Sequence, residues 1–502
     1  MPTARSWTDS LTDLGHLLRF RSQTVRRPRA AAIAASVLLA LTLGAMVVPA
    51  LVDSGRLVGK ADDVAGYLPS MLSGFLILSV VSAVSSGGGR ELLPRDQAAI
   101  HPITTTTEHL GALVLSPLNF AFLIQVWLLL GATSFTTGGD GWFVGQVLVL
   151  LWICFTTALA QAVGWTVEIV RRGERGVAIV RAVSIAGALG GIGLYLGGMF
   201  VPLLEGGPTR RLTFLMDGSA AGAWFAAALL LVMTGLMVTA GVVPAAAALR
   251  RAPRDELKVE SGIHPARPMP PSDSLMVVRM DRAAVWRSVP MRRGLLVLAL
   301  GPGLVALVGS MSWGSVMVLP GLVISGGALL FGVNAWCLDG RGVLWRESLP
   351  VSPEVIFRAR ARVLAEWLVG AAALTVTLAS ITAGKPTVNQ ALSVMTLLVV
   401  VTLQVVSVSM SWSGRRPFSV NLRSARATPA PPLVMVGYSS RLALSTTFTA
   451  LIFSTASGGG WWWLSPVLAV PFVLWSLRRL RRAEQAWVAP VSRAAVVMTV
   501  AG

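Results

Sequence analysis

GGGRELLPRDQAAIHPITTTTEH, residues 87–109, is a polar segment between two apolar runs, and the organisation of the chain follows outward from it. It begins with three glycines, carries charges of both signs around Pro94, and ends in a run of threonines that favours a helix start. A degenerate copy lies at 339–362, where charged residues precede the sequence LPVSPE (349–354) and a second helix start. We call these stretches the first and second polar segments.

The composition of the chain is that of a membrane protein. Hydrophobic residues make up 54% of its 502 residues and charged residues only 13%, about half of what soluble domains carry. Apolar runs of about 20 residues, the length that crosses a bilayer as a helix, recur along the sequence. We therefore expect an all-α polytopic membrane protein with about twelve transmembrane helices, at 30–52, 66–86, 110–131, 142–167, 177–204, 221–249, 294–311, 316–338, 363–382, 390–413, 433–456 and 461–477.

The predicted spans divide into two six-helix halves. A proline-rich, polar stretch at 251–278 predicts a cytosolic linker between a first half, 1–250, and a second half, 279–502. Each half begins with a short amphipathic stretch, 6–27 or 279–293, that predicts a helix lying on the membrane surface. Each polar segment follows the second span of its half. This match of position favours an internal duplication more strongly than the few shared residues do.

The distribution of basic residues sets the predicted topology. The net charge is +19, but the positive-inside rule accounts for it better than nucleic-acid binding, because no soluble module carries a basic stripe with aromatics. With the N-terminus inside, the predicted outside loops hold only five of the 42 Lys and Arg residues, and two more fall within spans. Both polar segments, the linker and both termini are then cytoplasmic. The preference for Arg over Lys is typical of GC-rich bacteria, so we expect a bacterial plasma-membrane protein.

No catalytic motif accompanies these features. The sequence has no G-x-x-x-x-G-K-[ST] loop to hold ATP phosphates, and no G-x-S-x-G or H-E-x-x-H motif. The two cysteines, Cys154 and Cys337, lie in apolar spans, and the four histidines lack the spacing of metal ligands. We therefore predict that the chain is not an enzyme and holds neither a metal nor a cofactor.

The polar segments supply candidate docking residues. A helix that mixes charge with Leu, Ile and Val at a cytosolic surface suits a groove on a soluble partner, whereas the alternative is an ordinary amphipathic loop on lipid headgroups. Thr105 and Glu108 also fit a capping box where the helix starts. The candidate docking residues are Arg90, Glu91, Arg95, Asp96, His101, Glu108, Arg341, Arg346, Glu347, Glu354 and Arg358.

A second set of candidates is polar and lies inside the predicted spans. Such side chains either bond a neighbouring helix or line a substrate route. They are Asn119, Gln125, Gln161, Asn334 and Gln404. The predicted spans hold no series of carboxylates that would form a proton relay.

The chain resembles the permease subunit of bacterial type-2 ABC exporters, in a form that fuses two halves. The resemblance rests on the surface helix before each half, the cytosolic segment between second and third spans, and two local stretches: LPVSP (349–353) followed by Arg358, Arg360 and Arg362, and GRRPFSVN (414–421). It implies that one chain supplies the complete transmembrane domain and moves an unidentified, amphipathic or drug-like substrate out of the cell. It also implies a separate P-loop ATPase, in two copies, that binds ATP and Mg²⁺ and docks on the polar segments.

Two other classes fit part of the pattern. A twelve-helix, ion-coupled secondary transporter shares the span count and the duplication, but the basic G-x-x-x-D-x-x-G-R-R loop expected after its second span is absent. A membrane-embedded transferase or scaffold is the third class, and the short external loops leave it little room for a catalytic site.

Overall fold

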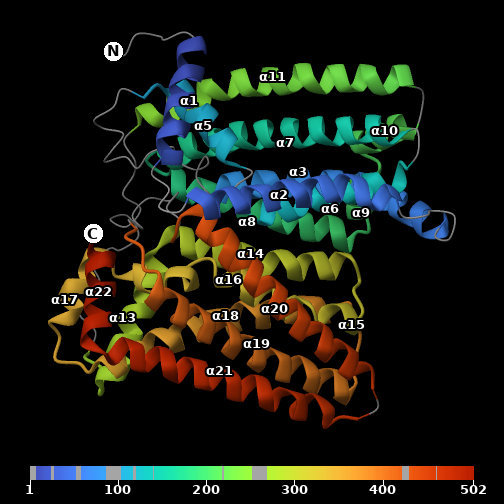
Figure 1. Cartoon of the computed structure of the whole chain (residues 1–502). Helices are drawn as coiled ribbons and strands as arrows, with labels where there is room; N and C mark the ends of the chain where they lie inside the picture. Colours follow the sequence, from blue (N-terminus) through green and yellow to red (C-terminus); the bar gives the residue numbers. More distant parts are fainter. Residues whose placement is uncertain are drawn as a thin grey trace. The chain divides into compact units, whose positions relative to one another are not determined.

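The computed structural model describes residues 7–23, 28–51, 58–85, 103–116, 120–138, 141–217, 220–251, 268–420, 429–459 and 461–502. Every regular element in these ranges is a helix and none is a strand, which confirms the predicted all-α class (Figure 1). The chain divides into two compact units, Met1–Arg254 and Asp255–Gly502. The boundary lies inside the stretch predicted as a linker.

The first unit begins with the amphipathic helix α1, which packs against α5, and is organised around the long helix α7, which packs against α3 and α11. Leu72, Leu130 and Leu148 are fully buried where α3, α6 and α7 meet. Its helices are α1 (Trp7–Gln23), α2 (Pro28–Val47), η1 (Val48–Leu51), α3 (Val58–Ser85), α5 (Thr105–Leu115), α6 (Phe120–Thr136), α7 (Trp142–Arg171), α8 (Gly176–Leu196), α9 (Phe200–Glu205), α10 (Pro208–Asp217) and α11 (Ala220–Arg250).

The second unit begins with the amphipathic helix α13, which packs against α18, and is centred on α18 and α19. Its helices are α13 (Asp273–Arg287), α14 (Val289–Val308), α15 (Trp313–Val316), α16 (Leu319–Gly327), η5 (Gly332–Leu338), η6 (Gly340–Gly342), α17 (Val343–Glu347), α18 (Pro353–Ser380), α19 (Val388–Arg415), α20 (Pro432–Gly458), α21 (Leu464–Val488) and α22 (Pro490–Ala501). The two units pair helices in the same order: α2 with α6 and α14 with α18, then α7 with α11 and α19 with α21.

Six helices among the described residues are long and apolar enough to cross a membrane, and a seventh is added if a pair bent by 41° counts as one span. The six lie at Val64–Val84, Trp142–Arg171, Gly176–Leu196, Ala221–Arg250, Pro353–Ser380 and Val388–Arg415, and the bent pair is Trp313–Gly327 with Gly332–Leu338. Shorter apolar helices lie at Ala35–Leu51, Phe122–Thr136, Gly294–Val308 and Pro490–Ala501. These lengths indicate a membrane protein, while the count of twelve spans stays a prediction.

Several predicted elements have different ends in the structure. The predicted span at 177–204 is interrupted between α8 and α9. Gly198 lies at the break with a φ of +69°, a left-handed conformation that glycine adopts without strain. The predicted last span at 461–477 is instead the longer α21, and the chain then forms α22. The predicted capping box with Thr105 as N-cap was wrong: Thr104 is the N-cap of α5, and its hydroxyl accepts a hydrogen bond from the Thr107 amide at 3.1 Å.

Candidate functional site: the second polar segment

The second polar segment is a compact series of short helical turns. The chain turns from η5 into η6 at Gly340, which has a φ of +49°, and α17 follows directly. Residues 348–352 then lead to α18, whose N-cap is Ser352 and whose first residue is Pro353, a favoured residue at this position. The second polar segment is therefore largely helical, in keeping with the predicted helix and not with the alternative of a loop.

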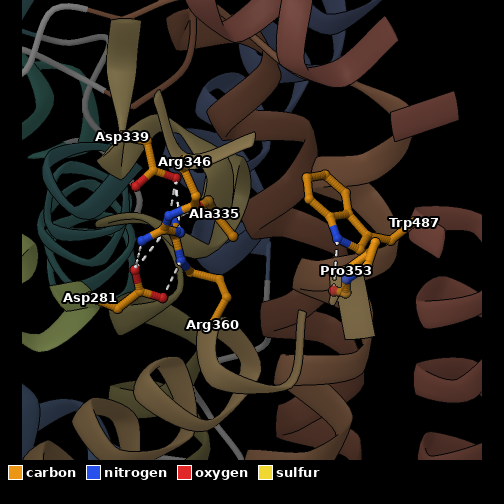
Figure 2. A network of polar contacts seen from close by, with 7 residues as sticks. All are labelled: Asp281, Ala335, Asp339, Arg346, Pro353, Arg360 and Trp487. Carbon is orange, nitrogen blue, oxygen red and sulfur yellow. Dashed lines mark hydrogen bonds and ion pairs between the residues drawn. The ribbon is translucent and has the colours of Figure 1, made fainter. Parts of the chain in front are cut away.

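A buried cluster of four charged side chains holds this segment against the rest of the unit (Figure 2). Arg360 of α18 lies at its centre, with its Nε 2.8 Å from Asp281 Oδ2 and its Nη2 2.8 Å from Asp339 Oδ2. Arg346 of α17 pairs with Asp281 and lies 3.1 Å from the same oxygen of Asp339. Two positive and two negative charges therefore join α13, α17, α18 and the η5–η6 turn. We call these four residues the charge cluster.

Burial makes the pairing within this cluster necessary. Arg360 and Asp281 have no exposed side-chain surface, and Asp339 and Arg346 have less than a tenth. Burial alone would raise the pKa of Asp281, but Arg360 and Arg346 outweigh it and hold that pKa below its ordinary value. Asp281 is therefore ionised at neutral pH, and removal of one member would leave an unpaired charge inside the protein.

Aromatic side chains connect the charge cluster to the end of the chain. The Arg360 guanidinium lies 5.3 Å from the centre of the Trp336 ring and donates to the Ala335 carbonyl. Trp336 stacks on Trp487 of α21, with ring centroids 3.6 Å apart and planes 5° from parallel. The Trp487 indole donates at 3.1 Å to the carbonyl of Pro353, which fixes the start of α18 (Figure 2).

The outward face of α17 is apolar. Val343 and Arg346 are buried, whereas 52% of Leu344 and 59% of Trp345 are exposed. Arg341 is exposed one turn earlier in the chain. We call Arg341, Leu344 and Trp345 the exposed Trp face. Tryptophan and arginine are the residue types enriched at binding hot spots.

The predicted docking residues fall into different environments. Arg346 was predicted to lie at the surface, but it is buried in the charge cluster. Glu347 pairs with Arg493 of α22 at 3.0 Å, and Arg358 pairs with Glu484 of α21 at 2.6 Å. Glu354 is partly exposed in the first turn of α18, and Glu108 lies in the first turn of α5. The candidates Arg90, Glu91, Arg95, Asp96 and His101 lie outside the described residues.

The helix that follows the first polar segment is held by His109. The Trp165 indole donates to His109 Nδ1 at 3.2 Å, and His109 Nε2 lies 3.1 Å from the Val238 carbonyl. An indole only donates, so Nδ1 accepts and Nε2 carries the proton. The buried ring is thus neutral and joins α5, α7 and α11. Gly241 makes room for it, since a Cβ there would stand 2.7 Å from His109 Cε1.

Two of the five polar residues predicted inside spans bond neighbouring elements. Asn334 is buried and donates to the Phe418 and Pro429 carbonyls at 2.8 and 2.9 Å, so it holds the polar stretch after α19. Gln404 accepts from Thr449 at 3.2 Å. Gln161 is buried in α7 and Gln125 is half-buried in α6. Asn119 lies outside the described residues.

Sequence reasoning missed Asp281, Trp336, Trp487 and Arg493. One signal for Asp281 was present, because it lies four residues after Val277 and four before Val285, on the buried face of α13. A carboxylate on an apolar face predicts a buried partner. The tryptophans carried no comparable signal. Among the described residues, no three His, Cys, Asp or Glu side chains gather as metal ligands would.

No family model, curated protein or solved structure matches the chain.

Proposed function

We propose that the chain is the transmembrane permease of an ATP-driven export system and that a separate P-loop ATPase docks on its polar segments. Three features support this function: helices long enough to span a membrane, an N-terminal amphipathic helix packed in each unit, and a sequence without a P-loop. ATP and Mg²⁺ belong to the partner, which we expect in two copies. The substrate leaves through the membrane helices and is amphipathic or drug-like.

One observation carries this proposal: the exposed Trp face is backed directly by the charge cluster. In α17, Trp345 faces outward and the adjacent Arg346 is buried in ion pairs with Asp281 and Asp339. An ordinary loop on lipid headgroups has no need of such support. A surface that receives force needs such support, because movement of α17 then passes to α13 and α18 through the cluster.

In this mechanism, the polar segment of each half passes the movement of the ATPase to the membrane helices. ATP binding closes the two ATPase copies, which displaces both polar segments and rocks the membrane helices between inward-open and outward-open states. Arg341, Leu344 and Trp345 bind the partner, and Arg360 transmits the displacement to α18. In the first half, the same displacement reaches α7 and α11 through His109.

Cysteine cross-linking tests the docking sites. The full chain is co-expressed with the P-loop ATPase that co-purifies with it, and single cysteines replace Ala98 in the first polar segment and Leu344 in the second. Val388→Cys is the control, because this residue is 73% exposed but begins α19 on the predicted outer side. We expect cross-links from positions 98 and 344 and none from 388. An intact complex in which neither position cross-links would overturn the docking sites.

Transport by the purified complex distinguishes the proposal from a secondary transporter. Proteoliposomes that hold the chain and the ATPase should export substrate only with ATP and should be insensitive to collapse of the proton gradient. Transport by the chain alone that collapses with the gradient would instead favour the ion-coupled class.

A further inference from the structure

Four arginines gather near the C-terminal end of α19, where it packs against α20 and α21. The Arg416 guanidinium lies 4.5 Å from the centre of the Trp412 ring, and that of Arg441 lies 6.0 Å from the same ring. Arg415 is adjacent on α19, and Arg479 approaches from α21, which packs against α19 and α20. We call Arg415, Arg416, Arg441 and Arg479 the arginine cluster.

The packing of α21 against α19 and α20 brings Arg479 toward the other members. Burial lowers the pKa of its guanidinium, and the positive charges of Arg415 and Arg441 lower it further. Arginine nevertheless stays charged in proteins. The cluster therefore concentrates positive charge around one tryptophan.

The cluster has no counter-charge in the described part of the chain, where its four members form no ion pair with a carboxylate. Six other arginines of the same unit differ, because each contacts an Asp or Glu: Arg282, Arg346, Arg358, Arg360, Arg362 and Arg493. The arginine cluster thus concentrates positive charge that no described carboxylate offsets.

Exposed apolar side chains continue from the cluster along the same helices. Leu444 and Phe448 follow Arg441 by three and seven residues, so they share its face of α20, and they are 69% and 65% exposed. Trp475 precedes Arg479 by four residues on α21 and is 71% exposed. A cationic site with apolar tracks beside it matches a phosphate headgroup with acyl chains.

We propose that the arginine cluster binds the phosphate headgroup of an anionic phospholipid of the cytosolic leaflet, whose acyl chains lie along α20 and α21. Guanidinium groups form paired hydrogen bonds with phosphate oxygens. The apolar tracks favour a lipid over a free phosphate, and the membrane-facing position favours a lipid over a soluble partner. This site is independent of ATP-driven export, so its test does not depend on the partner ATPase.

Lipid retention measured by mass spectrometry tests the site. The full chain is purified in detergent and incubated with an equal mixture of phosphatidylglycerol and phosphatidylcholine, and the bound lipids are counted. We expect retention of phosphatidylglycerol over phosphatidylcholine. The double variant R441Q/R479Q should weaken phosphatidylglycerol binding about thirtyfold, since each basic residue near a membrane surface contributes about fivefold.

Arg481→Gln is the matched control, because Arg481 lies two residues after Arg479 and therefore points away from it on α21. An equal loss of phosphatidylglycerol in R481Q would overturn the site and indicate general surface charge. A second arm adds sodium phosphate: displacement of the lipid at equal concentration would show an anion site with no lipid component. Unchanged lipid retention in R441Q/R479Q would also overturn the proposal.

Discussion

Arg360 binds both carboxylate oxygens of Asp281, with Nε 2.8 Å from Oδ2 and Nη2 3.0 Å from Oδ1 (Figure 2). This two-point ion pair joins the amphipathic helix α13 to α18 inside the protein. In the first unit, α1 meets α5 through Leu14 and Leu110, and the Ser10 and Thr104 hydroxyls lie 3.3 Å apart.

Asp281→Asn should destabilise the second unit strongly. The substitution leaves two buried guanidinium groups with only one carboxylate, and breaking a buried pair in this way costs about 3–5 kcal/mol. Unfolding of the purified full chain in detergent measures the loss. Asp273→Asn is the control on the same helix, where Asp273 is exposed in the first turn and a helix-end charge contributes about 0.3–1 kcal/mol. Equal losses from the two variants would contradict a special role for the cluster.

The stabilisation by Asp281 should persist to low pH. Its pKa is depressed by Arg360 and Arg346 against the effect of burial, so its contribution is fully present above the unfolded-state pKa of about 3.9. The contribution is lost only as the pH falls through the still lower folded-state pKa. The difference in unfolding free energy between wild type and D281N should therefore be constant from about pH 8 to pH 5. A difference that declines across that range would show that Asp281 is not held ionised.

Trp487→Ala should loosen the second polar segment. The substitution removes the stack on Trp336 and the hydrogen bond to Pro353, and loss of a buried tryptophan costs about 3–5 kcal/mol. Trypsin cleavage after Arg341, which is exposed, measures the opening of the segment and should become faster. Trp475→Ala on the same helix is the control, because Trp475 is 71% exposed and its loss should leave the cleavage rate unchanged.

The sequence predicted the features that follow from local patterning. Apolar length predicted the helices, and the apolar stripe of 279–293 predicted a helix that the structure places earlier, as α13, with residues 289–293 already in α14. Pairing between distant residues could not be predicted, since Asp281 and Arg360 are 79 positions apart. Likewise, only the structure reveals that Trp487 and α22 pack against the second polar segment.

Gly241→Ala should destabilise the first unit although alanine favours helices. A Cβ at this position would stand 2.7 Å from His109 Cε1, and overpacking of this kind costs about 1–3 kcal/mol. Gly235→Ala is a matched control on α11, because nothing lies within 4 Å of its Cβ position. That variant should gain about 0.5–1 kcal/mol from helix propensity alone. Thermal unfolding in detergent compares the two, and a gain in both would show that His109 yields without cost.

Trp345→Ala should weaken binding of the partner ATPase without unfolding the chain. Trp345 is 59% exposed, so little core packing is lost, but a tryptophan at the centre of an interface contributes about 2 kcal/mol or more, roughly thirtyfold in affinity. Trp462→Ala removes a tryptophan of similar exposure, 62%, from the predicted outer side and serves as the control. Binding of the ATPase to chain reconstituted in nanodiscs measures the effect. If both variants bind the ATPase as wild type does, the exposed Trp face is a lipid contact, because an interfacial tryptophan needs no protein partner.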